Sequence, residues 1–149
     1  MNLLSTSLVT DAHLMELPDE KKAAIRATVD SIAKSKGLNA DDVFEGVMER
    51  EQVMSTGMGH GVAVPHCKMT GLDDFYVSIS RSSKPIDYQS LDSTPVRILV
   101  LLLSPEDKTK EHVKMIAEIT KRLKFSNVRE AIIEAKTAKE MEEALTSPV

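Results

Sequence analysis

An apolar run in the second half of the chain limits the folds that this sequence can adopt. Residues 96–103 read Val-Arg-Ile-Leu-Val-Leu-Leu-Leu, and Arg97 is their only charged member. The uninterrupted apolar part, residues 98–103, is far too short for a helix that crosses a bilayer. A continuous apolar segment of this kind is typical of a strand whose two faces are both buried. We therefore predict that residues 96–103 form the central strand of a sheet.

Helical spacing of apolar residues occurs both before and after this strand. The first such segment lies between Pro18 and Gly37, and Asn39 is the expected N-cap of a second helix that ends near Glu51. Three further helices are predicted after the central strand: they begin beyond Ser104, at Ser126 and at Thr137. We therefore expect layers of helices against the sheet.

Two shorter strands are predicted before the central one, at residues 62–64 and 75–80. Residues 1–18 are expected to form an irregular or short helical lead-in, and residues 84–87 a turn. Because helices precede, separate and follow the strands, the sequence predicts an α/β fold, a three-layer α/β/α arrangement with a small mixed β-sheet flanked by helices. The short connection between the first two strands favours a mixed sheet over a parallel one. We expect residues 1–149 to form one domain.

Composition and charge exclude several classes of function. The chain has a net charge of −4, so it lacks the basic surface that nonspecific nucleic-acid binding requires. Cys67 is the only cysteine, which rules out an internal disulfide and suits a reducing compartment. The first residues contain neither the basic nor the apolar segment of a signal peptide. We expect a cytoplasmic protein with no membrane insertion and no nucleic-acid partner.

Residues 55–66 form the most specific pattern of the chain and read Ser-Thr-Gly-Met-Gly-His-Gly-Val-Ala-Val-Pro-His. Glycine lets the backbone approach a ligand closely, and successive backbone N–H groups can hold an anion. The candidate phosphate-binding residues are therefore Ser55, Thr56, Gly57, Gly59 and Gly61. A tight turn into a strand explains the same residues without a ligand. Pro65 fixes φ and has no N–H, so we expect it to end the strand and to leave His66 at the strand end.

Three side chains suit phosphate chemistry. His66 is a suitable nucleophile at neutral pH because the ordinary pKa of histidine is about 6.5. Arg50 ends a helix just before the glycine-rich stretch, and a guanidinium binds phosphate in bidentate fashion. His112 lies on the inward stripe of the helix that follows the central strand, where ligands collect in α/β sheets. If His66 lies at the end of the neighbouring strand, the two imidazole rings can meet.

Each of these residues also has an interpretation without catalysis. His66 can be a loop histidine without a role, Arg50 a solvated residue that complements the helix end, and His112 a satisfied core residue. The glycines and the proline beside His66 favour a function for it. His60, His66, Cys67 and His112 are metal-ligand types, but the sequence contains no His-Glu-x-x-His and no Cys-x-x-Cys pattern. We therefore predict no metal site.

With these residues taken together, the chain resembles the enzyme IIA of the fructose/mannitol type in the bacterial phosphoenolpyruvate-dependent phosphotransferase system. The resemblance rests on residues 50–51, 55–66 and 101–105 and on His112, and it covers nearly all 149 residues. It implies a three-layer α/β/α fold with a mixed sheet, a cytoplasmic location and no cofactor.

The resemblance also implies the roles of individual residues. His66 matches the histidine that takes a phosphoryl group from an HPr-like phosphocarrier protein and passes it to a cysteine of a IIB component. His112 matches the second active-site histidine, which is not itself phosphorylated, and Arg50 matches the arginine that steadies the phosphoryl group. His60 and Cys67 depart from the residues that are common in the family at these positions. We expect Cys67 to act as a small apolar side chain rather than as a redox switch.

Donor and acceptor proteins must dock transiently near His66. We therefore expect an exposed, partly apolar patch around it, for which Met58, Val62 and Met69 are candidates. The alternative for each of them is a place in the core.

The sequence leaves three functions open. We favour a IIA of the nitrogen-regulatory type, whose phosphorylation at His66 controls partner proteins, because no IIB or IIC domain is fused to the chain. The first alternative is a freestanding sugar-specific IIA that passes the phosphoryl group to a IIB component for fructose/mannitol-type sugar uptake. The second alternative is a binding domain of the same fold that is never phosphorylated.

Overall fold

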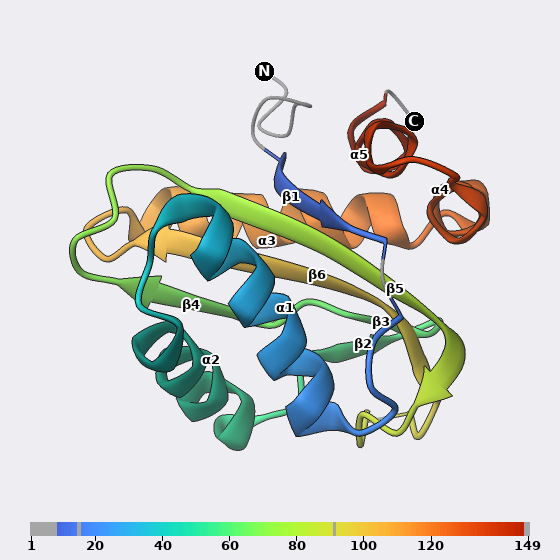
Figure 1. Cartoon of the computed structure of the whole chain (residues 1–149), viewed down its shortest axis with the longest axis horizontal. Helices are drawn as coiled ribbons and strands as arrows, with labels where there is room; N and C mark the ends of the chain where they lie inside the picture. Colours follow the sequence, from blue (N-terminus) through green and yellow to red (C-terminus); the bar gives the residue numbers. More distant parts are fainter. Residues whose placement is uncertain (1–8, 15, 91, 148–149) are drawn as a thin grey trace.

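The computed structural model describes residues 9–14, 16–90 and 92–147, which form five helices and one six-stranded sheet (Figure 1). The helices are α1 (Lys21–Lys36), α2 (Ala40–Val53), α3 (Thr109–Leu123), α4 (Ser126–Glu134) and α5 (Ala138–Thr146). The strands are β1 (Val9–His13), β2 (Gly57–Gly59), β3 (Val62–Ala63), β4 (His66–Met69), β5 (Tyr76–Ile86) and β6 (Val96–Pro105). None of the helices within these ranges has the length and apolar character that a membrane span requires.

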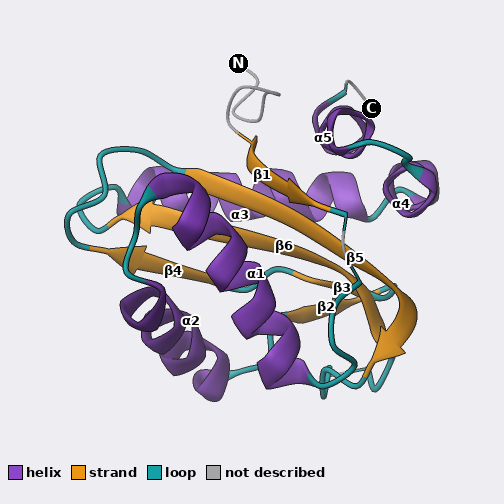
Figure 2. Ribbon diagram, in the orientation of Figure 1, coloured by secondary structure: helices purple, strands orange, loops and turns teal. Residues whose placement is uncertain are grey.

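The sheet is mixed and is built around β6, as the apolar run predicts. The strand order is β1-β5-β6-β3-β2, and β4 pairs with β6 beyond the end of β3. Strand β5 runs antiparallel to β6, whereas β3 and β4 run parallel to it. Helices α1 and α2 cover one face of the sheet, and α3, α4 and α5 cover the other (Figure 2). The predicted three-layer α/β/α fold is therefore confirmed.

The side chains of β6 alternate between two cores. Ile98 and Leu102 pack with residues of α3, α4 and α5, whereas Leu99 and Leu103 pack with residues of α1 and α2. All four are almost fully buried, and each such burial contributes about 1.5–3 kcal/mol relative to exposure. Burial on both faces explains why this strand shows no alternation of polar and apolar residues.

The end of α1 and the start of α2 lie where the capping signals indicate. Gly37 ends α1 with a φ of 67°, a left-handed conformation that glycine adopts at little steric cost. The side chain of Asn39 accepts a hydrogen bond from the N–H of Asp42 at the start of α2. Helix α2 continues slightly beyond its predicted end, to Val53.

Some strands differ from the sequence prediction because pairing with distant segments creates them. Residues 9–13 pair with β5 as β1, where the sequence predicts an irregular or helical lead-in; residues 1–8 and 15 of that lead-in lie outside the described part. The glycine-rich residues 57–59 form β2, and β5 extends to Ile86, into the segment that is predicted to turn at residues 84–87. Hydrogen bonding to a neighbouring strand overrides local propensity at these places.

His66 follows the end of β3, as the sequence predicts, but it is also the first residue of a further strand, β4, which the sequence does not predict. Pro65 does end the pairing of β3, since it has no N–H to give to the ladder. The chain then resumes pairing with β6 as β4, with His66 opposite Leu102. His66 therefore lies just after a break between two strands that both run along β6.

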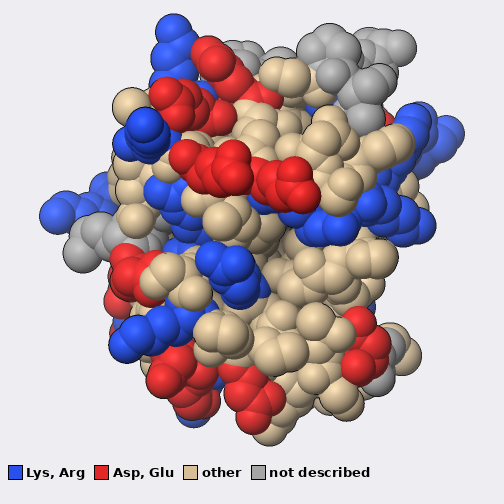
Figure 3. Space-filling view, turned by 90° about the vertical axis from the view of Figure 1, so that its right-hand side faces the viewer, with Lys and Arg blue, Asp and Glu red and all other residues tan. Residues whose placement is uncertain are grey.

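The surface carries charges of both signs. On the face shown in Figure 3, acidic and basic side chains are interspersed with uncharged surface. This mixture fits the small net charge of −4.

Candidate functional site

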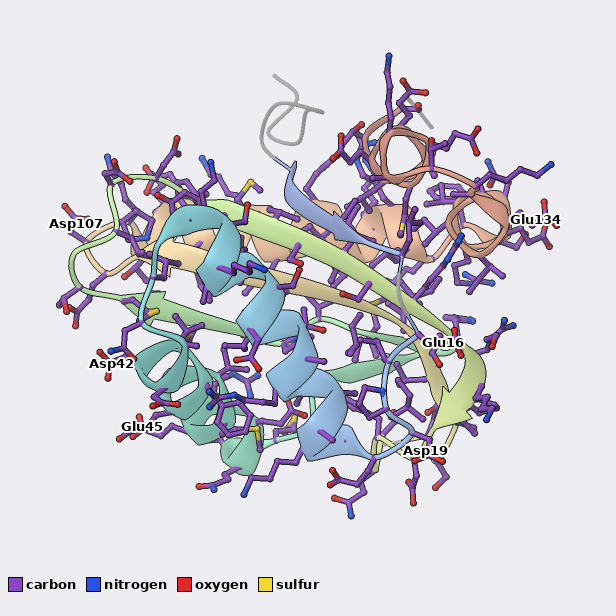
Figure 4. All side chains as sticks on the ribbon, viewed as in Figure 1. Glu16, Asp19, Asp42, Glu45, Asp107 and Glu134 are labelled. Carbon is purple, nitrogen blue, oxygen red and sulfur yellow. The ribbon has the colours of Figure 1, made fainter. Side chains whose placement is uncertain are left out.

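An open cavity of about 480 Å³ lies between α2, β4 and the start of α3. Its lining residues are Gly46, Glu49, Arg50, His66, Cys67, Lys68, Glu106 and His112. Figure 4 locates this end of the molecule by Asp42 and Glu45 on α2 and by Asp107, which lies in the connection from β6 to α3. The fold thus brings together Arg50, His66 and His112, the three residues for which the sequence predicts phosphoryl chemistry.

The break before β4 gives His66 its hydrogen-bond partner. Around this break, the N–H of Val64 donates to the carbonyl of Thr56 at 3.0 Å, and the carbonyl of Val64 lies 2.8 Å from Nδ1 of His66. A carbonyl oxygen can only accept, so Nδ1 carries the proton and Nε2 keeps its lone pair. The carbonyl of Val64 therefore favours the tautomer in which Nε2 is the nucleophilic atom.

His112 lies early in α3 and is buried. The centroid of its ring is 5.3 Å from that of His66, with an angle of 59° between the ring planes. The prediction that the two rings meet is therefore confirmed. Nδ1 of His112 lies 2.6 Å from Oγ of Ser104, a fully buried residue of β6. This contact leaves Nε2 as the ring nitrogen that can bind a group in the cavity.

Arg50 lies in the last turn of α2. Its Nη1 donates to the carbonyl of Met54 at 2.9 Å, just beyond the end of the helix, and the side chain also lines the cavity. A guanidinium has five N–H donors, and the contact with Met54 uses one of them. Both interpretations of Arg50 therefore have structural support, because its charge complements the helix end and its position allows it to bind an anion in the cavity.

Both imidazoles are held in the neutral form near pH 7. Burial lowers the pKa of His66 below its usual value, the hydrogen bond to Val64 opposes this shift, and the charge of Arg50 adds to it. Burial, followed by the charges of His66, Lys68 and Arg50, lowers the pKa of His112 to about 4. A neutral imidazole keeps the lone pair that a nucleophile needs, so the surroundings favour the reactive form of His66.

The five candidate phosphate-binding residues do not line this cavity. The N–H and the hydroxyl of Thr56 already bond to the carboxylate of Glu51, at 2.8 and 2.5 Å. A side chain at Gly57 would collide with Ser90, which gives this glycine a packing role. The carbonyl of Gly61 accepts hydrogen bonds from two N–H groups at the start of β6, away from the cavity. The phosphate-binding role of Ser55, Thr56, Gly57, Gly59 and Gly61 stays a prediction.

Glu51 is a buried carboxylate whose importance the sequence does not reveal. Besides Thr56, it binds the ammonium group of Lys21 at 2.9 Å. The hydroxyl of Thr56 lies 2.9 Å from that of Tyr88. These contacts tie the end of α2, which carries Arg50, to the segment that leads into the His66 strands. An acidic residue near the end of a polar helix usually faces solvent, so only the tertiary structure distinguishes Glu51.

Lys68 at the cavity and Ser104 behind His112 have no role in the sequence prediction. Lys68 lines the cavity, and its ammonium group donates to the hydroxyl of Thr109 at 3.1 Å. It follows His66 by two positions in β4, and this spacing places both side chains on one face of the strand. Ser104 contacts His112 from the end of β6. The two-residue spacing from His66 could have identified Lys68 from the sequence, whereas no local pattern indicates that Ser104 contacts His112.

Cys67 packs in the core beside α1 and α2 and has the properties of a buried apolar residue. Burial, with a contribution from the nearby charge of Glu49, raises the pKa of its thiol to about 12. The thiol therefore stays protonated, and a protonated thiol is a poor nucleophile.

In the described part of the chain, no three side chains of histidine, cysteine, aspartate or glutamate are grouped so that they could hold a metal ion.

Of the candidates for a docking patch, Val62 is excluded, and the alternative of a place in the core holds for it. Val62 is fully buried, and Met58 and Met69 are half-buried and pack against the two cores. Strand pairing with β6 draws this segment inward, which its sequence alone does not show. Exposed apolar side chains instead follow Arg50 and His112 in the chain: Val53 and Met54 lie at the end of α2, and Val113 lies on α3.

Comparison with known proteins adds independent findings. Residues 9–147 match the family described as "Phosphoenolpyruvate-dependent sugar phosphotransferase system, EIIA 2". A nitrogen regulatory protein of Pseudomonas aeruginosa is 31% identical over 137 residues, which span 91% of this chain and 89% of that protein. A fructose-specific EIIA component of the phosphotransferase system from Haloferax volcanii is 26% identical over 153 residues, which span 100% of this chain and 99% of that protein. The crystal structure of nitrogen regulatory protein IIA-Ntr from Neisseria meningitidis matches with a TM-score of 0.84 at 28% identity, over 97% of each chain.

Proposed function

Because the chain belongs to the EIIA 2 family of the phosphoenolpyruvate-dependent sugar phosphotransferase system, we propose that it carries a phosphoryl group on His66. One observation supports this proposal most directly. Nδ1 of His66 is bound to the carbonyl of Val64, so Nε2 has a free lone pair in a cavity that Arg50 and His112 also line. The proposed donor is an HPr-like phosphocarrier protein, and the proposed location is the cytoplasm.

In the proposed transfer, Nε2 of His66 attacks the phosphorus atom of a phosphohistidine on the donor protein. A new P–N bond forms while the P–N bond of the donor breaks, and the donor imidazole leaves with the electron pair of the broken bond. No proton changes place. The positive charge that develops on the His66 ring is stabilised through Nδ1–H by the carbonyl of Val64. Phosphoryl transfer has a loose transition state, so positioning and electrostatics provide most of the catalysis.

Arg50 and His112 have separate roles in this proposal. The guanidinium of Arg50 binds oxygens of the phosphoryl group, for which its planar set of donors is suited. His112 is neutral, so it assists through a hydrogen bond rather than through a charge. The ammonium group of Lys68 provides a second positive charge at the cavity. The carboxylates of Glu49 and Glu106 line the same cavity, so the binding of a dianionic phosphoryl group depends on direct contacts of its oxygens with the two cations.

We infer that phosphorylation of His66 has a regulatory purpose of the nitrogen-regulatory type. The Pseudomonas aeruginosa relative and the Neisseria meningitidis structure both bear the name of nitrogen regulatory protein. The alternative is a sugar-specific IIA that passes the phosphoryl group to a IIB component, and the name of the Haloferax volcanii relative favours it. The gene neighbourhood discriminates between them: genes for sugar-specific IIB and IIC components support transport, and a sigma-factor gene of RNA polymerase supports regulation.

Partner proteins are proposed to dock on the exposed apolar side chains Val53, Met54 and Val113, which we call the docking surface. Two of them follow Arg50 at the end of α2, and the third follows His112 on α3.

Phosphorylation in a reconstituted system tests the proposal. The protein is incubated with phosphoenolpyruvate, enzyme I and HPr, and its intact mass is measured before and after mild acid treatment. The proposal predicts an acid-labile gain of one phosphate that the His66→Ala variant lacks. Absence of any gain in the wild-type protein would support a binding domain that is not phosphorylated, and an undiminished gain in His66→Ala would refute the assignment of His66.

A further inference from the structure

We propose that Ser104 is a positioning residue that holds the proton of His112 on Nε2, so that this nitrogen donates a hydrogen bond to the phosphoryl group on His66. The inference rests on the proposed function of His66, since it specifies how the second imidazole of that site acts. It comes from one contact: Oγ of Ser104 lies 2.6 Å from Nδ1 of His112.

This contact can have either of two directions, and they give opposite chemistry. If Nδ1–H of His112 donates to Ser104, Nε2 carries only a lone pair, which repels the oxygens of a phosphoryl group. If the hydroxyl of Ser104 donates to Nδ1, the single proton of the neutral ring is on Nε2. Only the second direction gives the cavity a donor from His112.

The burial of Ser104 selects the second direction. Its side chain has no exposed surface, and within the described residues its hydroxyl has no hydrogen-bond partner other than His112. A hydroxyl has one proton to donate and can accept as well. If Nδ1 were the donor, the O–H bond of Ser104 would be left without an acceptor in a buried position, which is unfavourable. Donation from Ser104 to Nδ1 satisfies both groups.

The charge state of His112 makes the position of its proton decisive. A doubly protonated ring would donate from both nitrogens, and Ser104 would then not matter. Burial and the nearby charges of His66, Lys68 and Arg50 lower the pKa of His112 to about 4, so the ring is neutral near pH 7 and has one proton to place.

The two histidines of the cavity are therefore set to opposite tautomers by the groups behind them. His66 faces a carbonyl, which can only accept, so its proton is on Nδ1 and its Nε2 is a nucleophile. His112 faces a hydroxyl whose proton has no other acceptor, so its own proton is on Nε2. One imidazole is prepared to attack phosphorus, and the other is prepared to bind the oxygens around it.

The tautomers can be read directly from the unphosphorylated protein. Long-range proton–nitrogen correlation spectra of the wild-type protein near neutral pH distinguish a protonated ring nitrogen from a bare one. We expect a bare Nδ1 and a protonated Nε2 for His112, and the reverse for His66. A protonated Nδ1 on His112 would overturn the proposal. This measurement needs no variant and no phosphate, so it is independent of whether His66 is phosphorylated.

Substitution of Ser104 tests the consequence for phosphoryl transfer. In Ser104→Ala we expect a mixture of His112 tautomers and a rate of phosphoryl uptake that is about two-fold to ten-fold lower, the usual effect of losing one hydrogen bond. Ser104→Thr keeps the hydroxyl and should restore both properties. The matched control is Ser80→Ala, which removes a hydroxyl that is equally buried in β5 and should leave the rate unchanged.

A double-mutant cycle separates positioning from a general structural effect. If Ser104 acts through His112, Ser104→Ala should have no further effect on the rate in a His112→Gln protein. An equal loss in the wild-type and His112→Gln backgrounds would overturn the proposal. So would an unchanged His112 tautomer in a folded Ser104→Ala protein.

Discussion

His66 and His112 line one cavity, but their surroundings give them different properties. His66 contacts a backbone carbonyl and is half-buried, whereas His112 is buried and contacts a hydroxyl. Both have a pKa below the ordinary value for histidine, mainly because burial disfavours the charged ring. At the scale of single residues, the chemistry of the site therefore depends on which nitrogen of each neutral ring carries the proton.

Arg50 is expected to contribute most of the affinity for the phosphoryl group. Arg50→Ala should slow phosphoryl uptake from the phosphocarrier by roughly ten-fold to a hundred-fold, because hydrogen bonds to charged groups are worth about 1.5–3 kcal/mol. Arg50→Lys keeps the charge but not the planar donors, so its rate of phosphoryl uptake should lie between the rates of the wild-type protein and of Arg50→Ala. Quenched-flow measurement of the transfer rate tests this. A wild-type rate for Arg50→Ala would restrict Arg50 to its contact with Met54 at the helix end.

The lowered pKa of His112 makes the stability of the fold depend on pH. An unfolded histidine takes up its proton near pH 6.5, whereas His112 in the fold does so at about 4. Between these values the unfolded state binds more protons, so the free energy of unfolding decreases as the pH falls, with no further loss from His112 below about 4. Urea unfolding at several pH values in this window should show a larger decrease in the free energy of unfolding for the wild-type protein than for His112→Gln. Equal decreases for the two proteins would contradict the lowered pKa of His112.

At the scale of elements, the end of α2 and the strands around His66 form one connected unit. Glu51 binds Thr56 and Lys21, the carbonyl of Thr56 accepts from Val64, and the carbonyl of Val64 accepts from His66. These contacts explain how two segments on either side of the glycine-rich stretch hold Arg50 and His66 at one cavity.

Glu51→Gln should destabilise the fold by about 2–3 kcal/mol, because it leaves the largely buried ammonium group of Lys21 without its counter-charge. Urea denaturation at neutral pH measures the change. The matched control is Glu143→Gln, which breaks the exposed ion pair with Lys139 and should cost less than about 0.5 kcal/mol. If both substitutions have the same small effect, Glu51 does not hold α2 to the strands.

At the scale of the whole molecule, the docking surface should affect partner binding without affecting the chemical step. Val53→Ser and Val113→Ser remove exposed apolar contact area, so we expect the KM for the phosphocarrier to rise several-fold and kcat to stay near the wild-type value. Leu14→Ser is the control, since it removes an exposed apolar side chain that follows β1 at the opposite edge of the sheet. A fall in kcat with an unchanged KM would contradict the assignment of this surface.

The parts of the molecule that local pattern determines were predictable from the sequence. The apolar run of β6 indicates a doubly buried strand, Gly37 and Asn39 indicate helix boundaries, and the inward position of His112 follows from helical spacing. These features depend on neighbours in the chain, which a single sequence displays.

The parts that depend on distant contacts were not predictable. Strands β1, β2 and β4 exist because they pair with other strands, and β4 makes His66 the first residue of a strand that the sequence does not predict. The same holds for the contact between Ser104 and His112 and for the burial of Glu51, since no spacing rule connects these residues. The exposed positions of Val53 and Val113 likewise follow from how the helices pack.

The central claim is that Nε2 of His66 is the atom that takes up the phosphoryl group, and nitrogen-15 spectra of the phosphorylated protein test it most directly. After incubation with phosphoenolpyruvate, enzyme I and HPr, we predict phosphorus coupling to Nε2 of His66, while Nδ1 remains protonated and hydrogen-bonded to the carbonyl of Val64. Phosphorus on Nδ1 of His66, or on His112 instead of His66, would contradict the account.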